Sequence, residues 1–237
     1  MVHVPLVSGT QPAYGIFADL HVVCIIVREV GYMLGQYFYL FTWFIKAWLF
    51  KRKAPLQTVL FITDYCNLRC KHCTESGHGA TTMKKYDKIR EELEYAYSLG
   101  SRFVDLEGGE PTLWRDGDLR LNDVVRLAKE TGFYSVTVTT NGQQPFKGCA
   151  ADSIWVSVDG YRDYHDAVRG EGTFDKLDKN IRESGHPALS INMAINRLNR
   201  DSVADTIQYA KDNPAIRSIS LNFHTPYPGT EELMLPW

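Results

Sequence analysis

Three cysteines stand close together, directly after an apolar stretch at 58–63. Cys66 and Cys70 are separated by three residues, and Cys70 and Cys73 by two. Thiolates at such short spacing can hold an iron-sulfur cluster, and a cubane [4Fe-4S] cluster contains four irons. Three protein ligands would leave one iron open to a ligand that is not protein.

Two other interpretations of the cysteines stay open. A structural zinc site usually has four ligands, commonly in two paired arms, and His72 would have to be the fourth although it lies between Cys70 and Cys73. Alternatively, positions i, i+4 and i+7 share one face of a helix, which would make the cysteines buried thiols of a helical stripe. Asp64 and Asn67 favour a loop at this place.

A second motif follows the next expected strand. The stretch 102–106 runs into Glu107-Gly108-Gly109-Glu110-Pro111. Paired glycines let the backbone come close to a ligand, and a neighbouring carboxylate can accept a charge-assisted hydrogen bond from an ammonium group. The segment therefore suits a ligand that carries a primary amine.

The two motifs together resemble those of the radical S-adenosylmethionine (SAM) superfamily, and the resemblance extends over about residues 56–224. Further matches lie at 157–160 and 165–175. The resemblance implies a [4Fe-4S] cluster on Cys66, Cys70 and Cys73, whose open iron is chelated by SAM. It implies that Glu110 binds the amino group of SAM, that Ser157 contacts its ribose or carboxylate, and that Arg169 reaches its carboxylate. It also implies that Asn192 contacts the ribose and that His72 lies against the adenine. The implied cofactor-binding set is His72, Gly108, Gly109, Glu110, Asn141, Ser157, Asp159, Arg169 and Asn192.

The resemblance also implies a reaction. An outside donor such as flavodoxin or ferredoxin supplies one electron, and SAM is cleaved to methionine and a 5'-deoxyadenosyl radical that abstracts hydrogen from a substrate or adds to it. Here the cofactors carry the hard chemistry and the protein supplies orientation. Two alternatives stay open, namely a non-catalytic, membrane-tethered iron-sulfur carrier or sensor, and a peptide- or protein-modifying member of the family.

Short apolar runs alternate with helix-period segments from residue 58 onward, which indicates an α/β fold with a parallel sheet. The expected strands are 58–63, 102–106, 135–139, 153–158, 189–194 and 218–223. Helical faces lie between them; Gly100 and Gly132 are expected to end two helices, and Thr173 and Asp201 to cap two others. No full helix is expected at 141–152. Six such units fit the partial (β/α)6, TIM-like barrel implied by the resemblance, with the polar residues gathered at the carboxyl ends of the strands.

The N-terminal part differs in composition from the rest. Residues 1–20 lack periodicity and are expected to be poorly ordered, and 21–53 is expected to form an aromatic-rich hydrophobic helix. Within 30–50 only Gln36 and Lys46 are strongly polar, which suits a membrane span, an interfacial helix or a helix packed on protein. The basic residues at 51–53 would place the following domain, 54–237, at the cytoplasmic face of a membrane. A membrane-seeking helix suggests an apolar or lipid substrate, and the chain ends soon enough after the sixth strand to suggest truncation.

The net charge and the cysteines bear on the binding partners of the protein and on its cellular compartment. The formal net charge is −2, so no electrostatic nucleic-acid binder is indicated. There are five cysteines and no regular disulfide spacing, which indicates a reducing compartment. Cys149 could be a reactive thiol or a cluster ligand, but the favoured interpretation is a buried or inert thiol.

Overall fold

The computed structural model describes residues 34–51, 53–73 and 81–235. The chain divides into two compact units, Met1–Lys53 and Ala54–Trp237. The segment 1–20, for which poor order is predicted, lies outside the described residues, and so does the part of the predicted N-terminal helix at 21–33.

Residues 34–49 of the N-terminal unit are helical. The apolar side chains that are exposed on this helix recur at helical spacing, among them Tyr37, Phe38, Phe41, Phe44 and Trp48. Within the described ranges, none of the helices combines the length and apolar character needed to cross a membrane.

The C-terminal unit is built on one six-stranded parallel sheet with the strand order β1-β2-β5-β6-β7-β8. The strands are β1 (Gln57–Thr63), β2 (Phe103–Gly108), β5 (Ser135–Thr140), β6 (Ser153–Ser157), β7 (Leu189–Ile195) and β8 (Ile216–Phe223). All six predicted strands are present, and their ends fall within two residues of the expected positions. The sheet is consistent with the partial barrel that the sequence predicted.

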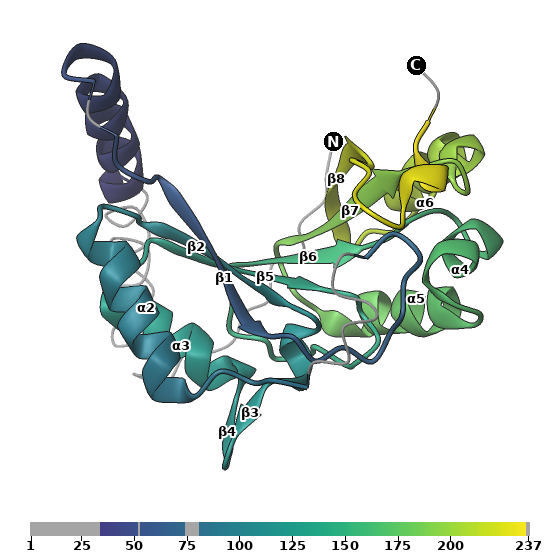
Figure 1. Ribbon diagram of the computed structural model, residues 1–237, viewed down its shortest axis with the longest axis horizontal. Helices are drawn as coiled ribbons and strands as arrows, with labels where there is room; N and C mark the ends of the chain where they lie inside the picture. Colours follow the sequence, from purple (N-terminus) through teal and green to yellow (C-terminus); the bar gives the residue numbers. More distant parts are fainter. Residues whose placement is uncertain (1–33, 52, 74–80, 236–237) are drawn as a thin grey trace, which may run out of the picture. The chain divides into compact units, whose positions relative to one another are not determined.

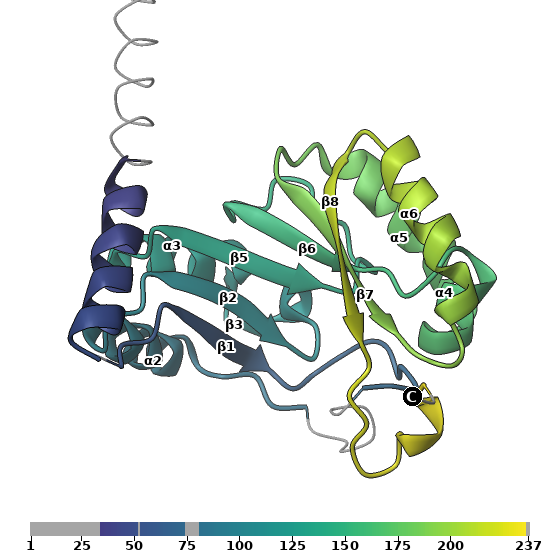
Figure 2. The same cartoon turned by 90° about the horizontal axis from the view of Figure 1, so that it is seen from above.

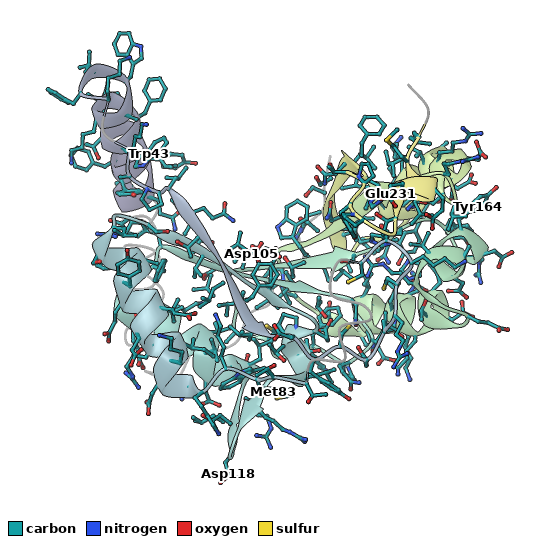
Figure 3. All side chains as sticks on the ribbon, viewed as in Figure 1. Trp43, Met83, Asp105, Asp118, Tyr164 and Glu231 are labelled. Carbon is teal, nitrogen blue, oxygen red and sulfur yellow. The ribbon has the colours of Figure 1, made fainter. Side chains whose placement is uncertain are left out.

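Helices follow the strands along the chain and lie along the outer side of the curved sheet (Figures 1 and 2). They are α2 (Tyr86–Ser98), α3 (Leu121–Thr131), α4 (Asp163–Arg169), α5 (Thr173–Ser184) and α6 (Val203–Asp212). A small hairpin, β3 (Arg115–Asp116) and β4 (Leu119–Arg120), precedes α3, with Asp118 at its tip (Figure 3). The stretch 141–152 contains no helix, as the sequence predicted.

Side-chain alternation explains why the sheet has two different faces. Every second residue of the central strands is buried and belongs to the hydrophobic core under the helices; examples are Leu106, Val138, Val156 and Ile191. The intervening residues on β2, β5 and β6 are only half-buried. Parallel sheets usually have both faces covered. Here the helices cover the buried face, so the half-buried residues of the inner face can line a site.

Two helices end where the sequence predicted. Gly132 ends α3 in the left-handed conformation with φ +110°, and Gly100 follows α2 with φ +111°. Positive φ is costly for residues with a Cβ atom, so glycine is the natural choice at both positions.

The two predicted N-terminal caps are wrong. Thr173 is the first residue of α5 rather than its cap, and the Asp166 carboxylate accepts the hydrogen bond from the Phe174 N–H at 2.8 Å. The nearby α4, which the sequence did not predict, brings this carboxylate to the positive end of α5. Asp201 lies in the 3-10 turn Arg200–Ser202, so Ser202 occupies the position before α6.

Candidate functional site

A cavity of about 220 Å³ lies at the carboxyl ends of β1, β2, β5 and β6. The predicted site residues that line it are Cys66, Cys70, Cys73, His72, Gly108, Gly109, Asn141, Ser157 and Arg169. Three predicted residues, Glu110, Asp159 and Asn192, do not line it. Four lining residues were not predicted, namely Glu107, Thr139, Thr140 and Tyr227.

The cysteine loop follows β1 and contains no helix between residues 64 and 73. The helical-stripe interpretation of the cysteines is therefore wrong. Neighbouring elements hold the loop: the Lys71 N–H donates to the Val168 carbonyl of α4 at 2.9 Å. The Asn141 side-chain amide donates to Cys66 Sγ at 3.6 Å, and Arg169 Nη1 donates to Cys70 Sγ at 3.8 Å.

The thiols of Cys66 and Cys70 are buried beside hydrogen-bond donors. Burial raises the pKa of the Cys66 thiol, and it raises the pKa of Cys70 to about 11 although the Arg169 charge opposes the shift. Buried thiols of this kind become thiolate ligands when a metal replaces the proton. N–H donors to sulfur, as at Cys66 and Cys70, are a recognised feature of iron-sulfur sites.

The zinc interpretation finds no support in the arrangement of possible ligands. In the described part of the chain, no three His, Cys, Asp or Glu side chains converge as ligands of a single metal ion. A cubane cluster makes a different demand, because each cysteine binds its own iron atom. Three thiols around one cavity fit the cluster better than a mononuclear site.

Gly108 and Gly109 bring the end of β2 against the cysteine loop. A Cβ atom on Gly108 would lie 2.2 Å from the Thr63 carbonyl oxygen, and one on Gly109 would lie 2.4 Å from the Tyr65 carbonyl oxygen. The Gly109 N–H donates to Thr63 at 2.7 Å, and the Glu110 N–H to Tyr65 at 2.8 Å. The glycines thus fix the distance between β2 and the chain that leads into Cys66.

Glu110 occupies a different position from the one expected of a ligand to a SAM amino group. It is fully buried, and its carboxylate accepts hydrogen bonds from the Thr112 hydroxyl at 2.5 Å, the Thr140 hydroxyl at 2.7 Å and the Asn141 N–H at 2.7 Å. The Thr112 N–H adds a fourth bond at 3.0 Å. These bonds engage the carboxylate with protein donors, and the carboxylate that lines the cavity is that of Glu107.

Glu107 and Asp105 lie on the inner face of β2, where Figure 3 shows Asp105 on the concave side of the sheet. The Thr139 hydroxyl of β5 donates to Asp105 at 3.1 Å. Burial, followed by the charge of Glu107, raises the pKa of Asp105 to about 7, and burial also raises the pKa of Glu107. The sequence offered one sign of both carboxylates: Asp105 and Glu107 are two positions apart at the end of an expected strand, directly before the glycine pair.

Asp105 should therefore make stability fall as pH rises from about 4 to about 7. In that range the folded protein holds a proton that the unfolded chain, with a pKa near 3.9, has lost, so deprotonation favours unfolding. Asp105→Asn should flatten this part of the profile, measured as the free energy of unfolding by urea at several pH values. Asp118→Asn, at the exposed hairpin tip, is the control and should leave the slope as in the wild type. Equal slopes in wild type and Asp105→Asn would contradict the assignment.

Asp159 lies behind the cavity wall and holds two of its residues. Its carboxylate accepts from Arg169 Nε at 2.6 Å and from the Ala194 N–H of β7 at 2.8 Å, and it lies 3.4 Å from His72 Nε2. Burial is the largest influence on the pKa of Asp159 and would raise it, but the charges of Arg169 and His72 and the Ala194 N–H together hold the pKa below the usual value. Asp159 therefore positions Arg169 and His72 and does not itself face the cavity.

His72 lines the cavity between two of the cysteines. Burial lowers the pKa of its imidazole despite the nearby Asp159. Its Nδ1 atom is buried and has no hydrogen-bond partner in the described structure. The Tyr227 hydroxyl donates to the His72 carbonyl, which ties the segment after β8 to the cysteine loop. An unsatisfied ring nitrogen at the cavity is a feature that a bound ligand can complete.

Ser157 and Asn192 are register partners on β6 and β7. Ser157 lines the cavity, whereas the Asn192 side chain accepts a hydrogen bond from Asn222 of β8 at 2.6 Å. The structure thus brings Ser157 to the cysteines and places Asn192 one strand further away.

Two of the curated proteins that are similar to this chain carry the same kind of name. A GTP 3',8-cyclase of Mannheimia succiniciproducens is 30% identical over 171 residues, which cover 65% of this chain and 50% of that protein. A probable GTP 3',8-cyclase of Saccharolobus islandicus is 29% identical over 170 residues, 67% of this chain and 54% of that protein. The chain spans about half the length of the curated relatives it matches.

Solved structures share the fold. SuiB of Streptococcus suis, solved with S-adenosylmethionine bound, superposes with a TM-score of 0.64 at 19% identity over 78% of this chain and 44% of that one. Methylornithine synthase superposes with a TM-score of 0.57 at 16% identity over 79% of this chain and 59% of that one. At such identities the likeness concerns the fold.

The family model of the radical SAM superfamily matches residues 60–210. This stretch covers more than half of the chain and contains the cysteine loop, the glycine pair and the Asp159-Arg169 pair. The chain belongs to the radical SAM superfamily, whose members use a [4Fe-4S] cluster and SAM.

Proposed function

We propose that the cavity holds a [4Fe-4S] cluster and SAM, and that the chain is the core of a radical SAM enzyme. The observation that carries the proposal is the convergence of the three cysteines with Gly109, Ser157 and Arg169 on one cavity. When bound and reduced, the cluster and SAM supply a 5'-deoxyadenosyl radical, with methionine as the second product.

The residues of the chain have separate tasks in this proposal. Cys66, Cys70 and Cys73 bind three irons. The backbone of Gly108 and Gly109 and the carboxylate of Glu107 accept hydrogen bonds from the SAM ammonium, a task that the sequence suggested for Glu110.

The opposite wall of the cavity suits the rest of SAM. Arg169 and Ser157 donate to its carboxylate or ribose, Asn141 adds an amide to the same wall, and His72 lies beside the adenine. A carrier such as flavodoxin or ferredoxin donates the electron.

A non-catalytic iron-sulfur carrier is the competing function. Electron carriage needs the cysteines but not a cavity beside them with a carboxylate, an arginine and close-packed glycines. These features support the enzyme.

The substrate is proposed to present a polar group to the inner face of the sheet. Asp105, Glu107 and Thr139 give that face hydrogen-bonding capacity, which an apolar chain would leave unsatisfied. Similar proteins are named GTP 3',8-cyclases, and SuiB was also solved with its precursor peptide. GTP and peptides are therefore the first substrates to assay, followed by a lipid extract for a lipid that has a polar head.

We propose membrane contact for the helix at 34–49 as a separate property. Its exposed aromatic side chains and Lys46 suit the headgroup region of an anionic bilayer. Sedimentation with phosphatidylserine vesicles tests this contact, which the substitutions Phe38→Ser and Phe41→Ser together should abolish; unchanged sedimentation would contradict it.

The test of the enzymatic proposal is anaerobic. Purified chain is reconstituted with iron and sulfide, mixed with SAM and dithionite, and 5'-deoxyadenosine is quantified. Wild type should produce it, and Cys70→Ala should produce none because one cluster ligand is lost. Cys149→Ala is the matched control, since Cys149 lies at a different cavity beside Phe146 and Leu121. A loaded cluster without 5'-deoxyadenosine in the wild type would favour the carrier.

A further inference from the structure

Arg169 lies between a carboxylate and a cysteine sulfur. Its Nε atom is 2.6 Å from Asp159 Oδ2, and its Nη1 atom is 3.8 Å from Cys70 Sγ. The side chains of Arg169 and Asp159 are only 11% and 1% exposed. A buried positive charge therefore touches the sulfur that would bind one iron of the cluster, and a buried negative charge sits directly behind it.

We propose that Asp159 and Arg169 act as a charge pair that sets the reduction potential of the cluster bound through Cys70. This inference rests on the proposed function, because it requires the cluster. It assigns a task to the pair beyond contact with SAM.

The physical basis is the charge that the cluster gains on reduction. One electron adds one negative charge, and net charge and hydrogen bonds to the sulfurs are the factors that set the potential of such clusters. In a buried, poorly polarisable site a neighbouring unit charge acts strongly. Arg169 favours the reduced cluster, and Asp159 offsets part of that effect.

The other ionisable groups around the pair contribute less charge. Burial lowers the pKa of His72, and it lowers the pKa of His165 to about 3, so the His165 imidazole is neutral near pH 7. Among the charges that act on the Cys70 thiol are those of Arg169 and Asp159, beside the other two cysteines. The potential should therefore respond to Arg169 and Asp159 above all.

The backbone fixes the carboxylate in place. Asp159 Oδ1 accepts the Ala194 N–H at 2.8 Å, and the Asp159 carbonyl accepts from the Asn199 side chain at 3.0 Å. Because β7 and the turn that follows it hold Asp159 through these two bonds, the carboxylate stays in place near the cluster when Arg169 is replaced.

The test measures the midpoint potential of the reconstituted cluster by anaerobic redox titration without SAM. The only reaction is the entry of one electron, supplied by dithionite, and no bond forms or breaks. Arg169→Gln should lower the potential, because it leaves the Asp159 charge uncompensated. Asp159→Asn should raise it, and the double variant should return close to wild type. Each single shift should change the ratio of reduced to oxidised cluster about tenfold at a fixed potential, which is about 59 mV for a one-electron couple.

Arg169→Lys is the matched control because it keeps the charge but not the planar fork, and its potential should stay closer to wild type than that of Arg169→Gln. If Asp159→Asn does not fold or load a cluster, the comparison of Gln with Lys at position 169 still decides the question. Loaded variants with unchanged potentials, or with shifts of the same sign, would overturn the inference. A wild-type chain that takes up no iron would instead contradict the proposed function.

Discussion

Gly109→Ala should prevent the cysteine loop from binding its cluster. The new Cβ atom would lie 2.4 Å from the Tyr65 carbonyl oxygen and 2.6 Å from that of Asp64. Both are backbone atoms, so no side chain can rotate away, and the chain entering Cys66 must move. We expect at least a tenfold loss of iron content after reconstitution, together with loss of SAM binding measured by equilibrium dialysis.

Gly148→Ala separates this steric effect from general backbone strain. Gly148 has φ +77° and open space around its missing Cβ, so the substitution should cost about 1 kcal/mol of stability and leave iron content unchanged. Normal cluster loading in Gly109→Ala would show that β2 and the cysteine loop do not need this close contact.

Glu110→Ala should destabilise the fold by about 3–5 kcal/mol. The substitution removes the acceptor of four hydrogen bonds and leaves the buried Asn141 N–H without its partner. Such unmade bonds at a fully buried site are among the largest single-residue costs. Urea unfolding of the protein without cofactors measures this effect, since it depends on the protein contacts alone.

Glu107→Ala should give the opposite pattern. Glu107 lines the cavity, so its loss should cost less than about 1 kcal/mol of stability while SAM binding weakens about tenfold. If Glu110→Ala instead folds normally and loses SAM binding, then Glu110 is the SAM ligand that the sequence suggested.

The strands and the cysteine loop were predictable because they depend on local patterns. Alternating burial defines strands such as 135–139, and glycines with positive φ end two of the helices, as at Gly132. The spacing of Cys66, Cys70 and Cys73 is itself a local signal. Polar residues at strand ends then converge, because parallel strands bring their carboxyl ends to one edge.

The remaining features depend on contacts between distant segments. The sequence could not distinguish Glu107 from Glu110, because only the fold shows that Thr140 and Asn141 engage the second carboxylate. It could not show that Asp159 acts through Arg169, since that requires the path of α4. The contribution of Tyr227 depends in the same way on where the chain runs after β8.

Because the chain is synthesised from its N-terminus, the residues of the cysteine loop exist before the distant residues that they contact. Cys66 meets Asn141 75 positions later, Cys70 meets Arg169 99 positions later, and His72 meets Tyr227 155 positions later. At about 5–20 residues per second, a ribosome needs on the order of 8–30 s to add the last of these partners. The thiols thus emerge early but are enclosed late, so the nascent chain offers them to iron, oxygen or a chaperone before the fold can protect them.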